Sequence, residues 1–87
     1  MQIDEPDMND AMIIKMIFHG SLKKYNSDRA EMELEIPDGM MVGELIQKID
    51  VPKDKIAFVA VNGSRAPVSQ ILQDGDEVKL FQLVGGG

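Results

Sequence analysis

Residues 31–50 read EMELEIPDGMMVGELIQKID, and within this stretch the hydrophobic period changes. From Glu31 to Ile36 charged and apolar residues alternate strictly, which predicts a strand with one solvent-facing side. Pro37-Asp38-Gly39 ends that strand. Apolar residues then follow the spacing of an amphipathic helix, at Val42, Leu45, Ile46 and Ile49. The stretch therefore predicts a strand followed directly by a helix, which ends near Asp50.

A second strand is predicted upstream, over the isoleucine-rich segment Met12–Phe18. Alternation places Met12, Ile14, Met16 and Phe18 on its core-facing side. The other side is also partly apolar, which favours a central position in the sheet. The polar segment Gly20–Asp28 is typical of a turn, so this strand and residues 31–36 are predicted to form a hairpin.

Three further strands are predicted after the helix. Ile56–Val61 is followed by Asn62-Gly63, a strong hairpin signal, and then by a short partner strand over Arg65–Val68. A turn at Asp74-Gly75-Asp76 precedes the last strand, Glu77–Val84, with Val78 and Leu80 facing inward and Lys79 and Phe81 outward. The order ββαβββ indicates an α+β domain with one helix packed on a mixed sheet. Gly43 in the first helical turn costs up to about 1 kcal/mol against alanine, so we expect a packing reason for it.

The chain has 87 residues, enough for one domain, and no cysteine. Its net charge of −6 is unevenly distributed, because residues 1–10 contain four acidic residues and no basic one. We predict that residues 1–10 are a disordered acidic extension and that residues 11–87 form the domain. The remainder has eleven acidic and nine basic residues. No concentrated basic surface suggests nucleic-acid binding.

The sequence also lacks a membrane-spanning run and a secretory pattern, so we expect a cytoplasmic protein. The single histidine, His19, is expected to be a surface or hydrogen-bonded residue, and no nucleophile–base pair can be built around it. Glu31, Glu33 and Glu35 are expected to be solvated, and no metal or cofactor motif is present. The protein is therefore not expected to be an enzyme.

The C-terminus is the remaining reactive group. The last predicted strand runs into Gly85-Gly86-Gly87. Without a Cβ, such a tail can extend into a channel too narrow for any side chain. The terminal carboxylate, with a reference pKa of about 3.3–3.7, is ionised at neutral pH and can attack a phosphate of ATP in a partner enzyme. A frayed terminus would have the same sequence.

Several segments together resemble the ubiquitin-like sulfur carriers, namely the small subunit of molybdopterin synthase and the thiamine-biosynthesis sulfur carrier. The similarity runs from about Met12 to the C-terminus. Its most specific part is the Asp74-Gly75-Asp76-Glu77-Val78 strand joined to the terminal glycines. The other matching segments are Phe18–Tyr25, Ile36–Gly39 with Val42–Leu45, and Val59–Gly63.

This resemblance implies a β-grasp fold and a cycle on Gly87 of adenylation, conversion to a thiocarboxylate and sulfur delivery. It implies two partners, a ubiquitin-activating-type adenylating enzyme and the large subunit of a sulfur-accepting synthase. We expect a monomer that forms hetero-complexes. Residues Phe18–Tyr25 and Ile56–Gly63 favour the molybdopterin type over the thiamine type. A protein modifier that forms isopeptide bonds, or a non-covalent β-grasp module, is also compatible with the sequence.

Two features differ from the family or extend its pattern. The family often places threonine where Met41 stands, and methionine cannot cap a helix by accepting a backbone N–H bond; we expect Asp38 to compensate or the first turn to fray. Gly85 replaces a larger residue in many relatives. The sheet face opposite the helix is predicted to carry Phe58, Ala60 and Phe81, with Ile13 and Ile17 as further candidates, and to bind the partners. The alternative is a reversed register, in which Phe58 and Phe81 complete the core.

Overall fold

A computed structural model describes residues 11–83. The predicted extension, residues 1–10, and the glycines Gly85, Gly86 and Gly87 lie outside the described residues, as does Val84. The elements, in chain order, are β1 (Ala11–Phe18), η2 (Gly20–Asn26), β2 (Glu31–Pro37), α1 (Val42–Lys48), η3 (Lys53–Lys55), β3 (Ile56–Val61), β4 (Ser64–Ala66) and β5 (Glu77–Gln82). Here η marks a short 3₁₀ helix.

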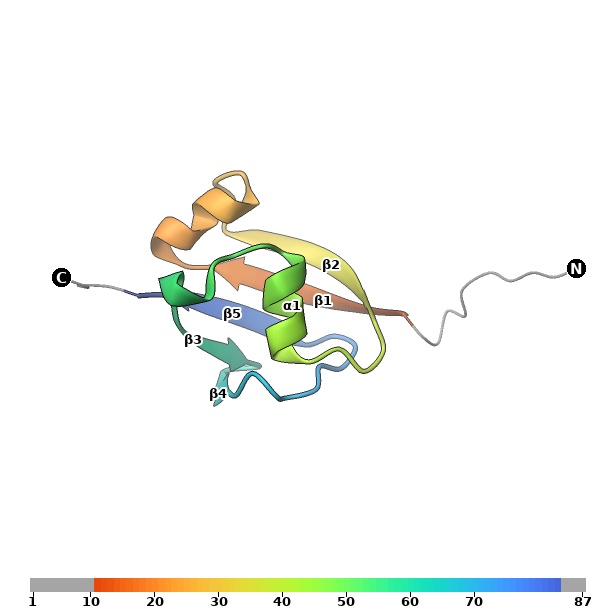
Figure 1. Ribbon diagram of the computed structural model, residues 1–87. Coiled ribbons are helices and arrows are strands. Elements are labelled where there is room, and N and C mark those ends of the chain that lie inside the picture. Colours follow the sequence, from red (N-terminus) through yellow and green to blue (C-terminus); the bar gives the residue numbers. More distant parts are fainter. Residues whose placement is uncertain (1–10, 84–87) are drawn as a thin grey trace, which may run out of the picture.

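The five strands form one mixed sheet in the order β2-β1-β5-β3-β4, and α1 lies across one face of it (Figure 1). β1 and β5 are parallel neighbours, and every other neighbouring pair is antiparallel. The predicted ββαβββ order and the central position of the first strand are therefore confirmed. Because β1 and β5 run parallel, the start of β1 and the end of β5 lie at opposite ends of the sheet.

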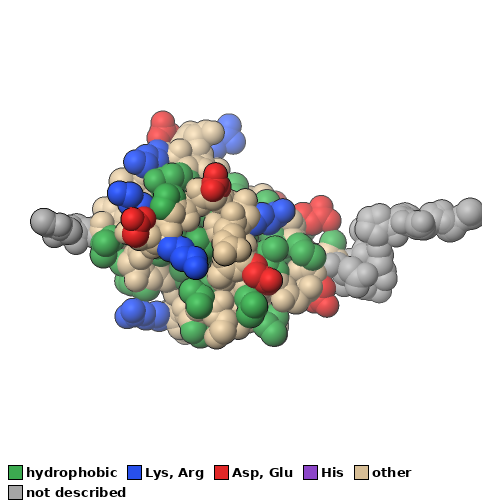
Figure 2. All heavy atoms as spheres, viewed as in Figure 1, with side chains coloured by type: hydrophobic (Ala, Val, Ile, Leu, Met, Phe, Trp, Pro, Cys, Tyr) green, Lys and Arg blue, Asp and Glu red, His purple; other side chains and the backbone are tan. Residues whose placement is uncertain are grey.

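The core lies between the sheet and α1, as the alternation predicted. Met12, Ile14, Met16 and Phe18 of β1 are all buried, and Val78 and Leu80 of β5 face them from the neighbouring strand. The helix contributes Val42, Leu45 and Ile46. Glu31, Glu33 and Glu35 are exposed on β2, as predicted. On the helix side of the surface, charged groups of both signs are interspersed with apolar ones (Figure 2).

The first turn of α1 is capped by backbone carbonyls of the loop after β4, and not by Asp38 as expected. The N–H groups of Val42 and Gly43 donate to the carbonyls of Gln70 and Val68, each at 2.9 Å. The Met41 N–H donates to Glu44 Oε1 at 2.9 Å. Carbonyl groups of a loop distant in sequence therefore accept hydrogen bonds from the first N–H groups of the helix. The expectation that Asp38 compensates or that the first turn frays was wrong. A Cβ at Gly43 would lie 3.4 Å from Val68 of the same loop, at ordinary van der Waals distance, so this contact does not supply the packing reason expected for Gly43.

Three predicted boundaries were wrong. The segment after β1 was predicted to be a turn, but Gly20–Asn26 forms the short helix η2. The chain turns only after it, at Ser27 and Asp28, which both have positive φ. The short strand ends at Ala66 rather than Val68, because the chain leaves β3 to cap α1. The last strand ends at Gln82. The Asn62-Gly63 hairpin is confirmed, with φ of 53° and 87°.

Candidate functional site

Four flat side chains stack in a row across the sheet face opposite the helix. The His19 and Phe81 rings lie 4.4 Å apart at 11°, and the Phe58 and Phe81 rings lie 4.5 Å apart at 13°. The guanidinium carbon of Arg65 lies 5.0 Å from the centre of the Phe58 ring. We call these four residues the aromatic column. Stacked pairs of this kind contribute about 0.5–1.5 kcal/mol beyond the apolar area they bury.

The column forms because four segments bring these residues to the same face. Phe58 pairs with Phe81 across β3 and β5, while their neighbours Val59 and Leu80 pair on the core side. A shift in register between Ile56 and Phe58 lets Ile56 pack against the core while Phe58 stays on the open face. Phe58 and Phe81 therefore lie opposite the helix, as predicted, and outside the buried core.

The other residues predicted for this face differ in how much surface they offer. Ala60 lies on the face but is only 6% exposed, between its cross-strand partners Lys79 and Arg65. Ile17 is half-buried beside Lys79, and Ile13 is 53% exposed. A molecule docking here would therefore meet aromatic rings flanked by two cations, and would touch little of Ala60.

His19 was predicted to be a surface or hydrogen-bonded residue, and it lies partly exposed at the end of the open sheet face. It is half-buried against Phe81, and its Nε2 atom is buried without a hydrogen-bond partner among the described residues. Its own backbone N–H donates to the Leu80 carbonyl at 3.1 Å, which fixes the residue beside the end of β5. Nothing in the sequence around His19 indicates the ring it stacks on, because Phe81 is far away in the chain.

The end of β5 is held from both sides at the point where the chain continues toward the glycines. The Gln82 side chain accepts a hydrogen bond from the Ser21 N–H at the start of η2. The Leu83 N–H donates to the Lys55 carbonyl at 2.9 Å, and the Leu83 side chain is 57% exposed. The tail therefore starts from a fixed point at the same end of the sheet as the aromatic column.

The rest of the described chain offers little other chemistry. No cluster of three or more His, Asp or Glu side chains able to hold a metal occurs among residues 11–83. No helix in that range is long and apolar enough to cross a membrane. The sheet order, the one α-helix that residues 11–83 place on its face and the glycines that follow β5 in the sequence together define a ubiquitin-like protein of the β-grasp class.

The chain belongs to the ThiS family, whose model matches residues 16–87. The family is that of the ubiquitin-like sulfur carriers, so the resemblance seen in the sequence is confirmed. A curated relative is the molybdopterin synthase sulfur carrier subunit of Mycobacterium tuberculosis, 28% identical over 80 residues that cover 85% of this chain and 96% of the relative.

Solved structures confirm the fold. A putative molybdopterin converting factor subunit 1 from Pyrococcus furiosus superposes with a TM-score of 0.70 at 24% identity, covering 84% of this chain and 99% of that one. The small archaeal modifier protein 1 of Haloferax volcanii gives 0.67 at 18%, covering 80% and 95%. The complex of subunits 1 and 2 of the molybdopterin-converting factor from Helicobacter pylori gives 0.60 at 20%, covering 87% and 100%.

Proposed function

We propose that this protein carries sulfur as a thiocarboxylate on Gly87 and delivers it in the synthesis of molybdopterin. The observation that carries the proposal is the pairing of a glycine tail with a fixed starting point at Leu83, next to an aromatic surface on the open face of the sheet. The name of the curated relative favours molybdopterin over thiamine as the pathway.

The chemistry needs no catalytic side chain from this chain. The Gly87 carboxylate attacks the α-phosphate of ATP in an adenylating enzyme, and pyrophosphate leaves. A hydrosulfide-equivalent donor then attacks the acyl carbon, and AMP leaves with one of the original carboxylate oxygens. The product, a thiocarboxylate, is a soft anion that can transfer its sulfur inside a second enzyme.

The aromatic column is the proposed docking surface for the adenylating enzyme and for the large subunit of the synthase. Phe58 and Phe81 supply flat apolar area, and aromatic residues of this kind dominate interface energies. Arg65 and Lys79 flank the rings and favour partners with acidic groups at the rim of the contact. Ala60 is only 6% exposed, so it adds little contact area. Its small side chain would instead let a partner approach the backbone of β3 closely.

The test is mass spectrometry after incubation with ATP, a sulfur source and the adenylating enzyme. The protein should gain the mass of one oxygen-to-sulfur exchange, located at Gly87. Gly86→Ala should suppress the exchange by adding a Cβ where the channel is narrowest. Gly85→Ala should be milder, since a side chain occurs there in many members of the family. Both variants should melt as the unmodified protein does, because the core lies upstream of Leu83.

A protein modifier is the second candidate, favoured by the shared fold of the archaeal modifier protein. In that case a lysine amine of a target attacks the same acyl-adenylate, and an isopeptide bond forms. Adducts on target lysines without any sulfur gain would make the modifier assignment correct. If neither product forms with any adenylating enzyme, the tail is inert and the proposal is wrong.

A further inference from the structure

The chain after β4 turns away from β3 instead of continuing beside it. β4 pairs with β3 only along Val59–Val61. Pro67 has no N–H to donate to a ladder, and the Val68 carbonyl accepts the Gly43 N–H at the start of α1. Within residues 11–83, no strand therefore covers the outer side of Ile56–Phe58.

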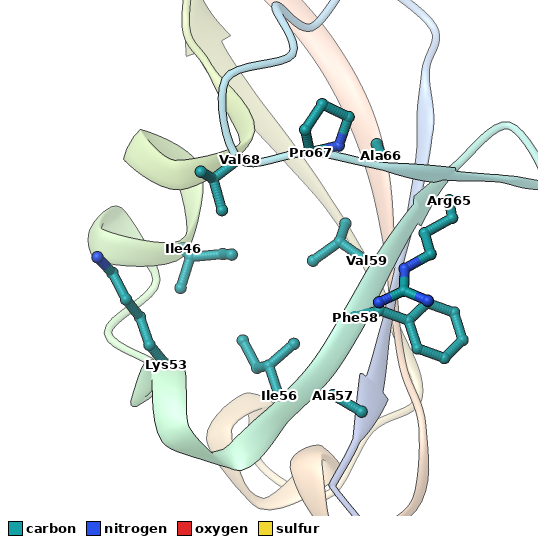
Figure 3. Close-up of a pocket in the computed structure, with 10 residues that line it drawn as sticks. All are labelled: Ile46, Lys53, Ile56, Ala57, Phe58, Val59, Arg65, Ala66, Pro67 and Val68. Atoms are coloured by element: carbon teal, nitrogen blue, oxygen red, sulfur yellow. The ribbon is translucent and has the colours of Figure 1, made fainter.

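This divergence opens a pocket of about 530 Å³ between α1 and the edge of the sheet. In Figure 3, Ile46 of the helix and Val68 of the loop face Ile56 and Val59 of β3 across the opening. Its volume falls in the range of about 300–1,000 Å³ typical of ligand pockets. Val68 is 61% exposed, so the opening is accessible from solvent.

The charged residues that line this pocket are both cations. Lys53 and Arg65 are its charged lining residues, but the Arg65 guanidinium stacks on Phe58 beyond β3, whereas Lys53 borders the opening on the helix side (Figure 3). Neither forms an ion pair with a carboxylate among residues 11–83. A cation beside an apolar opening favours a ligand that combines an apolar side chain with an acidic group.

We propose that this pocket binds an extended acidic peptide segment of a partner protein. A branched aliphatic side chain would enter between Ile46 and Val59, and a neighbouring carboxylate of the peptide would face Lys53. A peptide fits better than a small molecule because the pocket lies where β4 would have continued, so its shape is that of an absent strand. Edge-strand recognition of this kind uses side-chain pockets for specificity. The site lies at the sheet edge and is additional to the tail.

The experiment pans a display library of random twelve-residue peptides against the full-length protein. Enriched peptides should combine a branched aliphatic residue with flanking Asp or Glu. In the protein's amide spectrum they should shift Ile56, Ala57 and Val68. Lys53→Glu and Val68→Glu, two substitutions at exposed positions, should each weaken binding by about tenfold or more. Lys48→Glu makes the same charge change on the exposed side of α1 and should have little effect.

Three results would overturn the proposal. The first is no enrichment. The second is enrichment of peptides that shift Lys79 and Phe81 instead, or whose binding survives Lys53→Glu. The third is self-association of the full chain through its own acidic residues 1–10, which would assign the pocket to a second copy. The oxygen-to-sulfur exchange at Gly87 should be unchanged in Lys53→Glu, so failure of this proposal and failure of the carrier function are distinguishable.

Discussion

At the scale of single residues, Asp76 joins two turns that are far apart in the chain. Its Oδ1 accepts from Asn62 Nδ2 at 2.8 Å, and its Oδ2 accepts from the Gln73 N–H at 2.8 Å. Asn62 Oδ1 in turn accepts from the Glu77 N–H at 2.9 Å. Asp76→Ala leaves both donors without an acceptor, so we expect a loss of about 2–3 kcal/mol in the free energy of unfolding, measured by urea denaturation.

The matched control is Asp54→Ala, which removes an exposed carboxylate from η3. It should change the free energy of unfolding by less than about 0.5 kcal/mol. Equal losses in the two variants would mean that the Asp76 hydrogen bonds add nothing beyond the general effect of removing a carboxylate.

At the scale of elements, α1 is a seven-residue helix whose start depends on a loop. Met41 has the extended backbone of an N-cap, with φ −93° and ψ 160°, but no side-chain hydrogen bond. Met41→Thr places a hydroxyl oxygen, a stronger acceptor than the methionine sulfur, beside the Glu44 N–H, while the bond from the residue 41 N–H to Glu44 Oε1 remains. We expect the free energy of unfolding to rise by about 0.5–1 kcal/mol, measured by thermal and urea denaturation.

Met41→Val is the matched control, because valine is β-branched like threonine and lacks the hydroxyl. It should not stabilise the protein. If Thr and Val have the same effect, the gain comes from the branched shape or from the contact with Ile71, which bridges to Met41, and the capping argument is wrong.

At the scale of the whole molecule, the proposed docking surface and the core occupy opposite faces of one sheet. Phe81→Ser removes the central ring of the aromatic column, so it should weaken binding to the adenylating enzyme by tenfold or more. It also loses two stacking contacts, so we expect a fall of about 1–2 kcal/mol in the free energy of unfolding. Calorimetric titration measures the first quantity and denaturation the second.

Leu80→Ala, one residue earlier on the core side, separates the two effects. Leu80 is fully buried, so its truncation should cost about 2–5 kcal/mol of stability. The fraction that remains folded should bind the enzyme with nearly unchanged affinity. If Phe81→Ser instead destabilises as strongly as Leu80→Ala and binds normally, Phe81 is a structural residue and the docking surface lies elsewhere.

Much of the fold could be predicted from the sequence because its elements depend on local pattern. Strict alternation at Glu31–Ile36, helical spacing from Val42 and the Asn62-Gly63 turn are each specified by a few adjacent residues. The inward and outward sides of β5 followed from the same rule. The glycine tail and the family resemblance were likewise properties of the sequence itself.

Only the tertiary structure decided which distant residues meet. The stack of His19 on Phe81, the loop carbonyls that cap α1 and the end of β4 at Ala66 all depend on contacts between segments far apart in the chain. The pocket beside Ile56 exists because the chain after Ala66 leaves the sheet, and its carbonyls accept hydrogen bonds from the first N–H groups of α1. Local periodicity specifies which face a side chain occupies, but the partner across that face is set by how the elements pack.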